Sequence, residues 1–320
     1  MLRFSPVVLC LAGCLVYTNV DLTTRKQPFE EVVIKEAESF WTSEKLAILD
    51  IHGLLAKRYP SPSLLASDLS ADPVSDLKEA LDRAAADGDV RGVLLRIDSP
   101  GGLVAWCDAM YREVERFRQR TGKPVLAYVT GLGASGGYYV ALGAGEIWAA
   151  PASTVGSIGV IAVFLNLKGL AEKIGVEIQV VKSGPKKDMG SLWRGLAPEE
   201  RKVMQGMIDQ YYKRFLDLVV ANRKELNREE LSRLADGRLL TAQQAQSAGL
   251  IDRVGYLDEA LKRLKELAGL EDAAVIAYAR SYQYVNNIYS GPAAPSISLD
   301  LKQVLGVLSP GFYYVWYPAP

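Results

Sequence analysis

Short apolar runs alternate with amphipathic stretches along the chain from Leu46 onward. Runs bounded by glycine, proline or charged residues are typical of buried strands, and apolar positions three and four residues apart are typical of helices. This pattern predicts strands at residues 46–51, 93–97, 125–129, 147–149 and 178–181. It predicts helices at residues 75–86, 103–118, 135–143, 199–222, 229–235, 242–248 and 257–267. Strands that alternate with helices in this order are typical of an α/β fold.

The N-terminus carries a separate apolar segment. A mostly apolar stretch, Phe4 to Val20, follows Arg3 and ends before Asp21. As a helix it would be about 25 Å long, slightly shorter than the roughly 30 Å hydrocarbon core of a bilayer. A charged start followed by an apolar centre predicts a membrane anchor or a signal peptide over residues 1–20. Because Arg3 precedes the span and Asp21 follows it, the positive-inside rule predicts that the rest of the chain lies outside the cytoplasm.

Cys14 offers an alternative for the same segment. The run Leu11-Ala12-Gly13-Cys14 resembles a lipoprotein signal, in which the cysteine is lipidated after cleavage. The apolar residues that continue beyond Cys14 favour a membrane anchor over lipidation. Residues 21–44 are polar and charged, and we expect them to form a linker or a short helix.

The composition is that of a folded enzyme without an evident polyanionic partner. With 320 residues, 49% of them hydrophobic, the chain is long enough to bury a sizeable core. Its 37 basic and 37 acidic residues balance, and no basic stripe interleaved with aromatic residues predicts nucleic-acid binding. A P-loop motif is absent from the sequence, and the three cysteines have neither zinc-site nor disulfide spacing. We therefore expect no metal and no organic cofactor.

Ser135 stands out as a candidate nucleophile. It lies among small residues in Gly131-Leu132-Gly133-Ala134-Ser135-Gly136-Gly137, between an expected strand and an expected helix. A serine at a strand-to-helix turn lies near the positive end of the helix and is presented to a substrate. The surrounding glycines remove side chains that would block a close approach.

A nucleophilic serine needs a base, and histidine is a poor candidate here. The one histidine, His52, precedes Ser135, whereas the nucleophile elbow of the α/β-hydrolases requires a histidine after the serine. We therefore expect His52 to be structural. Lysine is the documented alternative base in Ser-Lys enzymes. The loop from Val181 to Ser191 carries three lysines, although such a loop taken alone is more often a solvated surface.

A second glycine turn offers backbone donors. The run Asp98-Ser99-Pro100-Gly101-Gly102 follows the expected strand at 93–97. Backbone N–H groups at such a turn can bind an oxyanion, although a tight turn without a catalytic role fits the same pattern.

Taken together, these segments resemble the signal peptide peptidase A family, bacterial Ser-Lys proteases related in fold to the Clp protease proteolytic subunit and the crotonases. The resemblance covers residues 45–268. It is carried by five motifs in the same order as in the family, namely Asp98-Ser99-Pro100-Gly101-Gly102, Gly133-Ala134-Ser135-Gly136-Gly137-Tyr138-Tyr139, Thr154-Val155-Gly156-Ser157-Ile158-Gly159-Val160, Lys182-Ser183-Gly184-Pro185-Lys186-Lys187-Asp188, and Asp236-Gly237-Arg238 with Gly249-Leu250-Ile251-Asp252.

The resemblance assigns a role to each site residue. It implies that Ser135 is the nucleophile, that Lys187 is the general base and that Ser157 holds the lysine amine by a hydrogen bond. It implies that Gly102 and Gly136 supply the oxyanion-hole N–H groups.

One position departs from the family form. Lys186 stands where the family often has histidine, so two adjacent lysines are candidates for the base. A lysine that serves as base must be neutral part of the time, so we expect Asp188 to point away from it.

The resemblance also implies a domain order and a fold. Residues 1–20 are the anchor or signal segment, and residues 21–44 are a linker. Residues 45–268 form one Clp protease/crotonase-like domain, a fold built of repeated ββα units, and the chain carries a single copy of this domain. Residues 269–320 are a C-terminal extension. The aromatic end of that extension, Tyr313 to Tyr317, is expected to dock on a surface.

The implied function is that of a membrane-associated serine endopeptidase. It would degrade remnant signal peptides or other short hydrophobic peptides through an acyl-enzyme, at the extracytoplasmic side of a bacterial cell membrane. A ring-shaped homo-oligomer is also implied, with Ser135 and Lys187 from neighbouring subunits as one way to complete a site. The alternatives are a crotonase-type acyl-thioester enzyme, which would not need Ser135, and an inactive membrane scaffold of the same fold.

Overall fold

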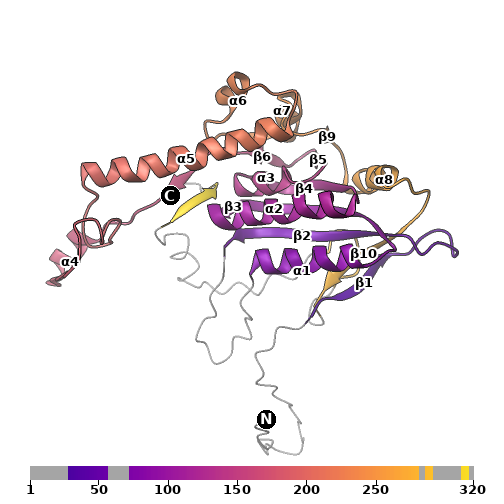
Figure 1. Ribbon diagram of the computed structural model, residues 1–320, viewed down its shortest axis with the longest axis horizontal. Helices are drawn as coiled ribbons and strands as arrows, with labels where there is room; N and C mark the ends of the chain where they lie inside the picture. The colour runs from indigo at the N-terminus through magenta and orange to yellow at the C-terminus, as the bar shows by residue number, and fades with distance from the viewer. Residues whose placement is uncertain (1–27, 57–71, 281–284, 291–310, 317–320) are drawn as a thin grey trace, which may run out of the picture.

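The computed structural model describes residues 28–56, 72–280, 285–290 and 311–316 (Figure 1). Its strands are β1 (Glu30–Lys35), β2 (Lys45–Leu55), β3 (Val90–Leu103), β4 (Val125–Ala134), β5 (Glu146–Ala149), β6 (Thr154–Gly156), β7 (Ile161–Ala162), β8 (Leu239–Thr241), β9 (Arg253–Val254), β10 (Ala274–Ala279) and β11 (Phe312–Val315). Its helices are α1 (Pro73–Ala86), α2 (Val104–Thr121), α3 (Gly136–Ala141), α4 (Lys168–Lys173), α5 (Pro198–Asn222), α6 (Arg228–Leu234), α7 (Ala242–Ser247) and α8 (Leu257–Leu267).

A mostly parallel sheet forms the centre of the molecule. The strands follow the order β1-β10-β2-β3-β4-β5-β9, and every pair along this path is parallel except the antiparallel β1–β10 pair at one edge. Parallel strands need helical crossovers, and α1 and α2 supply them between β2 and β3 and between β3 and β4. The expectation of an α/β fold is confirmed.

Both faces of the sheet are buried, because alternate residues of each strand point to opposite faces. In β2, Ala47, Leu49 and Ile51 belong to a cluster with apolar residues of α1, α2 and α3. Leu46 and Ile48 belong to a second cluster with the apolar face of α8. This double cover explains why the central strands read as continuous apolar runs in the sequence.

Two central strands are longer than their apolar runs predict. β3 continues beyond Ile97 to Leu103, and β4 continues beyond Val129 to Ala134. These extensions are polar or glycine-rich, and they are held by backbone pairing with β2, β6 and β11 rather than by apolar burial. They carry the two glycine turns to one end of the sheet.

Other segments differ more from expectation. Residues 30–35, within the expected linker, form β1, which pairs with β10 of the C-terminal extension. The strand expected at 178–181 is not formed: these residues are exposed and pair with no strand of the described ranges.

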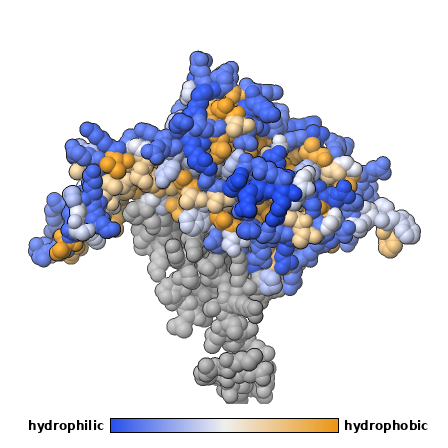
Figure 2. Space-filling view, in the orientation of Figure 1, coloured by the Kyte–Doolittle hydropathy of each residue, from blue (hydrophilic) through white to orange (hydrophobic). Residues whose placement is uncertain are grey.

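The segment between β7 and α5 leaves the body of the molecule as an arm. It spans residues 163–197, includes α4, and projects at the left of Figure 1, beyond the sheet. Exposed aliphatic side chains gather on it, among them Leu170, Ile174, Ile178 and Val181. The orange and pale patches at the left of Figure 2 lie in this region.

The predicted membrane anchor and lipidation site lie in the N-terminal part of the chain, before the first described residue. The apolar segment at 4–20 and Cys14 lie outside the described residues. Within the described ranges, none of the helices combines the length and the apolar character that a membrane crossing requires.

Candidate active site

Ser135 occupies the sharp turn between β4 and α3. Its backbone has φ of 49° and ψ of −110°, a conformation that a residue with a side chain rarely adopts. The turn is fixed at both ends, because the Ser135 N–H donates to the Gly156 carbonyl at 2.7 Å and the Ser135 carbonyl accepts from the Tyr139 N–H at 2.9 Å. A strained and tightly held serine at a strand-to-helix turn is typical of a nucleophile.

Ser157 lies beside Ser135. β4 and β6 pair in parallel, with Ala134 opposite Gly156, so the two serines follow neighbouring positions of the ladder. Ser157 also has a positive φ, of 50°, and its N–H donates to the Arg238 carbonyl at 2.7 Å. The Asp236-Gly237-Arg238 motif therefore supports Ser157 through a backbone atom.

The expected Gly101–Gly102 turn lies instead within the end of β3, where Gly101 has a φ of 100°, and it lies against the start of α3. A methyl group added to Gly101 would come within 2.5 Å of the Gly136 backbone nitrogen, and one added to Gly102 within 2.0 Å of the Leu55 carbonyl oxygen. Only glycine fits at both positions. The structure thus brings together Ser135, Ser157, Gly102 and Gly136.

Ser99 fastens this turn, a role that the sequence did not reveal. Its side chain is buried, its hydroxyl donates to the Gly53 carbonyl at 2.7 Å, and it accepts from the Gly101 N–H at 3.0 Å. The pairing register of β2 with β3 shifts between His52 and Leu54, and the Ser99 hydroxyl binds the Gly53 carbonyl at this irregularity. A serine-to-backbone contact of this kind leaves no periodic pattern that sequence reasoning can find.

The C-terminal strand covers the glycine turn. β11 pairs antiparallel with β3, with Tyr314 opposite Gly102 and Val315 opposite Gly101, and it also pairs with β7. The Trp316 N–H donates to the Pro100 carbonyl at 2.8 Å. Ser135 itself is buried, with 1% of its surface exposed.

Tyr314 anchors β11 in an aromatic pocket. Its ring is fully buried, stacks on Tyr139 with 4.8 Å between the ring centres, and lies 4.9 Å from the Phe215 ring. Its hydroxyl donates to the Tyr211 carbonyl at 2.8 Å. The expected docking of the aromatic tail thus occurs, for the described part, against α3 and α5.

The buried groups behind Ser135 are poor bases. Burial raises the pKa of the Cys107 thiol and of the Tyr138 and Tyr139 hydroxyls well above their usual ranges. The Tyr139 hydroxyl instead donates to Asp108 at 2.6 Å, which also accepts from Arg214. With their pKa values raised, these three groups stay protonated at neutral pH and cannot act as bases there.

The structure does not bring Lys187 to Ser135 within one chain. Lys186 and Lys187 are exposed side chains on the arm, in the turn that joins α4 to α5. Figure 1 shows this part of the arm beyond the left end of the sheet, whereas β4 and α3 lie near its centre. Asp188 accepts hydrogen bonds from Lys182 and Arg194, and these contacts are consistent with the expectation that it does not pair with Lys187.

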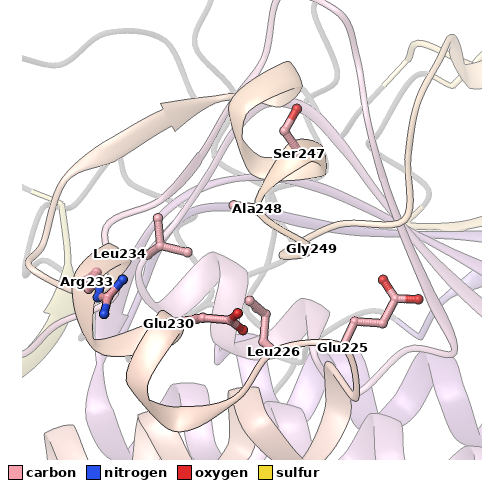
Figure 3. Close-up of a pocket in the computed structure, with 8 residues that line it drawn as sticks. All are labelled: Glu225, Leu226, Glu230, Arg233, Leu234, Ser247, Ala248 and Gly249. Carbon is pink, nitrogen blue, oxygen red and sulfur yellow. The ribbon is translucent and has the colours of Figure 1, made fainter.

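Other candidate sites have less to offer. His52 is exposed on β2, opposite Asp98 in the ladder. A hollow of about 410 Å³ lies between the end of α5, α6 and α7, and the residues that line it include none of the expected site residues (Figure 3). Across the described ranges, no group of three or more histidine, cysteine, aspartate or glutamate residues is arranged to hold a metal ion.

Comparison with known proteins gives a consistent picture. Residues 117–271 match the model of peptidase family S49. The chain is 35% identical over 264 residues to a putative signal peptide peptidase SppA of Enterococcus faecium, and this match covers 82% of this chain and 75% of that protein. It is 38% identical over 198 residues to the putative protease MJ0651 of Methanocaldococcus jannaschii, and this match covers 62% of this chain and 63% of that protein.

Two further matches are more distant in length or sequence. Protease 4 of Salmonella typhi is 32% identical over 230 residues, which cover 72% of this chain and 36% of that protein. Among solved structures, a ClpP1 mutant from Listeria monocytogenes matches 68% of this chain and 95% of its own, with a TM-score of 0.43 and 15% identity. The chain spans just under two thirds of the archaeal relative and a smaller share of Protease 4.

Proposed function

Since the chain belongs to the signal peptide peptidase A family, peptidase family S49, we propose that it is a serine endopeptidase with a Ser-Lys dyad. In this proposal the Ser135 hydroxyl attacks the scissile carbonyl while its proton passes to the neutral Lys187 amine. The Gly102 and Gly136 N–H groups stabilise the resulting oxyanion. The protonated lysine then gives its proton to the leaving amine, and water releases the acyl group from Ser135.

The observation that carries the proposal is the convergence at Ser135. A strained serine, a neighbouring strained serine and two glycine turns come from three strands of the sheet to one point. A structural serine has no need of a positive φ, and strain of this kind is concentrated at functional sites. A crotonase-type enzyme would use the glycine turns without Ser135.

The second half of the dyad is proposed to come from a neighbouring subunit of a ring. Lys187 sits on an arm that projects from its own chain, and this arm carries exposed aliphatic side chains. Docking the arm against another copy would bury those side chains and carry the lysine to the next copy's Ser135 and Ser157. Ser157 would then hold the lysine amine by a hydrogen bond.

The remaining expectations complete the proposal. We propose that the Clp protease/crotonase-like domain, expected at residues 45–268, also includes β1, β10 and β11, which pair into the same sheet. Residues 1–20 would anchor it at the outer side of a bacterial cell membrane, with lipidation of Cys14 as the alternative anchor. The substrates would be remnant signal peptides or other short hydrophobic peptides. If the arm of a neighbouring copy docks beside Ser135, its aliphatic side chains would favour such hydrophobic substrates.

The decisive experiment is peptide hydrolysis and fluorophosphonate labelling by the full chain. Ser135→Ala is expected to abolish both, because loss of the nucleophile removes most of the catalysis by a linked dyad. Lys187→Ala is expected to be as damaging, whereas Lys186→Ala should keep substantial activity. Retention of hydrolysis by Ser135→Ala would refute the protease proposal, and the reverse ranking of the lysines would place the base at Lys186.

A further inference from the structure

The proposed base has a carboxylate directly beside it. Asp188 follows Lys187 in the chain, in a short turn where the Lys187 N–H donates to the Gly184 carbonyl at 3.2 Å. An ionised carboxylate close to a lysine amine favours the charged, protonated amine. A Lys187 paired with Asp188 would therefore be a poor proton acceptor at neutral pH.

Both carboxylate oxygens of Asp188 instead accept hydrogen bonds from two other cationic side chains. Arg194 donates through Nε to Oδ2 at 2.9 Å and through Nη2 to Oδ1 at 2.7 Å, and Lys182 Nζ lies 2.7 Å from Oδ1. The hydrogen bonds from Arg194, followed by that from Lys182, hold the pKa of Asp188 well below its usual range. The carboxylate thus stays ionised, and both of its oxygens are already engaged.

Arg194 is itself fixed by the first turn of α5. Its Nη1 and Nη2 atoms donate to the two carboxylate oxygens of Glu200 at 2.7 and 2.6 Å. Glu200 is buried, with 4% of its surface exposed, and it also accepts from the Ala197 N–H at 3.0 Å. Arg194 therefore forms two hydrogen bonds with Asp188 and two with Glu200, and so links the turn that carries Lys187 to the first turn of α5. Because Glu200 belongs to a helix, that helix fixes the position of Arg194.

We infer that Arg194 is a positioning residue for the proposed dyad, and that it acts by holding the Asp188 carboxylate away from the Lys187 amine. The inference rests on the proposed function, since it concerns the base of that dyad. Within the described part of the chain, the charged groups that contact Asp188 are Lys182 and Arg194, and Glu200 is bound to the latter. Lys186 and Lys187 adjoin Asp188 along the chain.

The test is the pH dependence of peptide hydrolysis by the full chain. Arg194→Met frees one side of Asp188, which can then pair with Lys187 and keep it protonated. We expect the midpoint of the rising pH–rate profile to move up by about one unit, a roughly tenfold loss of rate below the midpoint, with the rate at high pH little changed. The double variant Arg194→Met/Asp188→Asn removes the competing carboxylate and is expected to return the midpoint to that of the unmodified chain.

Two further variants separate this role from a structural one. Arg263→Met breaks a comparable arginine–carboxylate contact, with Glu146, far along the chain and should leave the midpoint unchanged. Arg194→Lys keeps a charge on Asp188 and should shift the midpoint by less than Arg194→Met does. It also provides the measurement if the methionine variant does not fold.

The outcomes distinguish the two proposals. An inactive Lys187→Ala together with an unchanged midpoint in Arg194→Met overturns only the role of Arg194. An equal loss of rate at every pH, not relieved by Asp188→Asn, overturns it as well, because it would mean that Arg194 only holds the turn in place. Full activity of Lys187→Ala overturns the assignment of Lys187 and with it the role of Arg194, whereas the protease proposal itself is refuted by an active Ser135→Ala.

Discussion

At the scale of single residues, backbone strain marks the proposed site. Ser135 and Ser157 are the two non-glycine residues with positive φ within the described ranges. Each such conformation costs on the order of 1–3 kcal/mol and persists only where the surroundings enforce it. Here the enforcing contacts are the hydrogen bonds of the two serine N–H groups to the Gly156 and Arg238 carbonyls.

A pair of substitutions at Ser157 tests whether this strain serves function. Both Ser157→Gly and Ser157→Ala remove the hydroxyl that is proposed to hold the lysine, so both should lose at least about tenfold in kcat. Glycine also relieves the positive φ, so the glycine variant should be more stable than the alanine variant by about 1 kcal/mol in urea unfolding. Equal stability of the two variants would show that the position is not strained.

Ser99 should matter for rate more than for binding. Ser99→Ala leaves the Gly101 N–H and the Gly53 carbonyl without their side-chain partner, which loosens the turn that carries the Gly102 N–H. We expect kcat to fall about tenfold with KM little changed, because an oxyanion contact acts mainly in the transition state. The matched control is Ser153→Ala, which removes another buried serine with a single local bond, to the Ala150 carbonyl. A loss of rate that is equal in both variants would contradict a specific role for Ser99.

At the scale of elements, apolar runs located the central strands and missed their ends. The predicted centres of β2, β3 and β4 were correct because these strands are buried on both faces. Their extensions, and the pairing of β1 with β10, depend on backbone hydrogen bonds between distant segments, which no local pattern encodes. The start of α5 was predicted within one residue, because Pro198 fits the first turn of a helix.

The same reasoning applies to the site. The Ser135 motif predicted a strand-to-helix turn from its glycines, and the structure has that turn. The assignment of Lys187 depended on resemblance, since an exposed loop lysine has no distinguishing local pattern. The roles of the Arg238 carbonyl and the Ser99 hydroxyl could not be predicted, because each forms a hydrogen bond with the backbone of a distant segment, at Ser157 and Gly53 respectively.

β11 is the element with the clearest testable consequence. It pairs with the Gly101–Gly102 segment of β3, which in the proposed function is where an extended substrate approaches Ser135. Deleting residues 311–320 should raise the rates of peptide hydrolysis and fluorophosphonate labelling severalfold, while lowering the thermal midpoint because the buried Tyr314 is lost. Adding back a synthetic peptide of residues 311–317 should slow labelling again. A truncated protein that keeps its fold but labels more slowly would show that β11 helps to build the site.

At the scale of the whole molecule, the proposed site is divided between a body and an arm. The body carries the serines and the glycine turns, and the arm carries the lysines (Figure 1). The separation suits an assembly in which each subunit completes its neighbour, since head-to-tail contacts close into rings.

Mixed assemblies test this division directly. Ser135→Ala and Lys187→Ala chains, each inactive alone, should regain about a quarter of the unmodified activity when refolded together in equal amounts, because random placement in a ring pairs an intact serine with an intact neighbouring lysine at one site in four. Mixing the folded proteins without dissociation is the control and should restore less. A refolded mixture that stays inactive, although the oligomers form, would place both residues of the dyad in one chain.

The position of β10 bears on how the chain is made. β10 lies between β1 and β2 in the sheet, yet it is synthesised long after both. At about 5–20 residues per second, the outer edge of β2 waits on the order of tens of seconds for its partner, with its backbone donors and acceptors unpaired. β1 cannot join the sheet until β10, the strand with which it pairs, has been synthesised. We therefore expect the unpaired edge of β2 to be the part of the nascent chain most exposed to pairing with another chain.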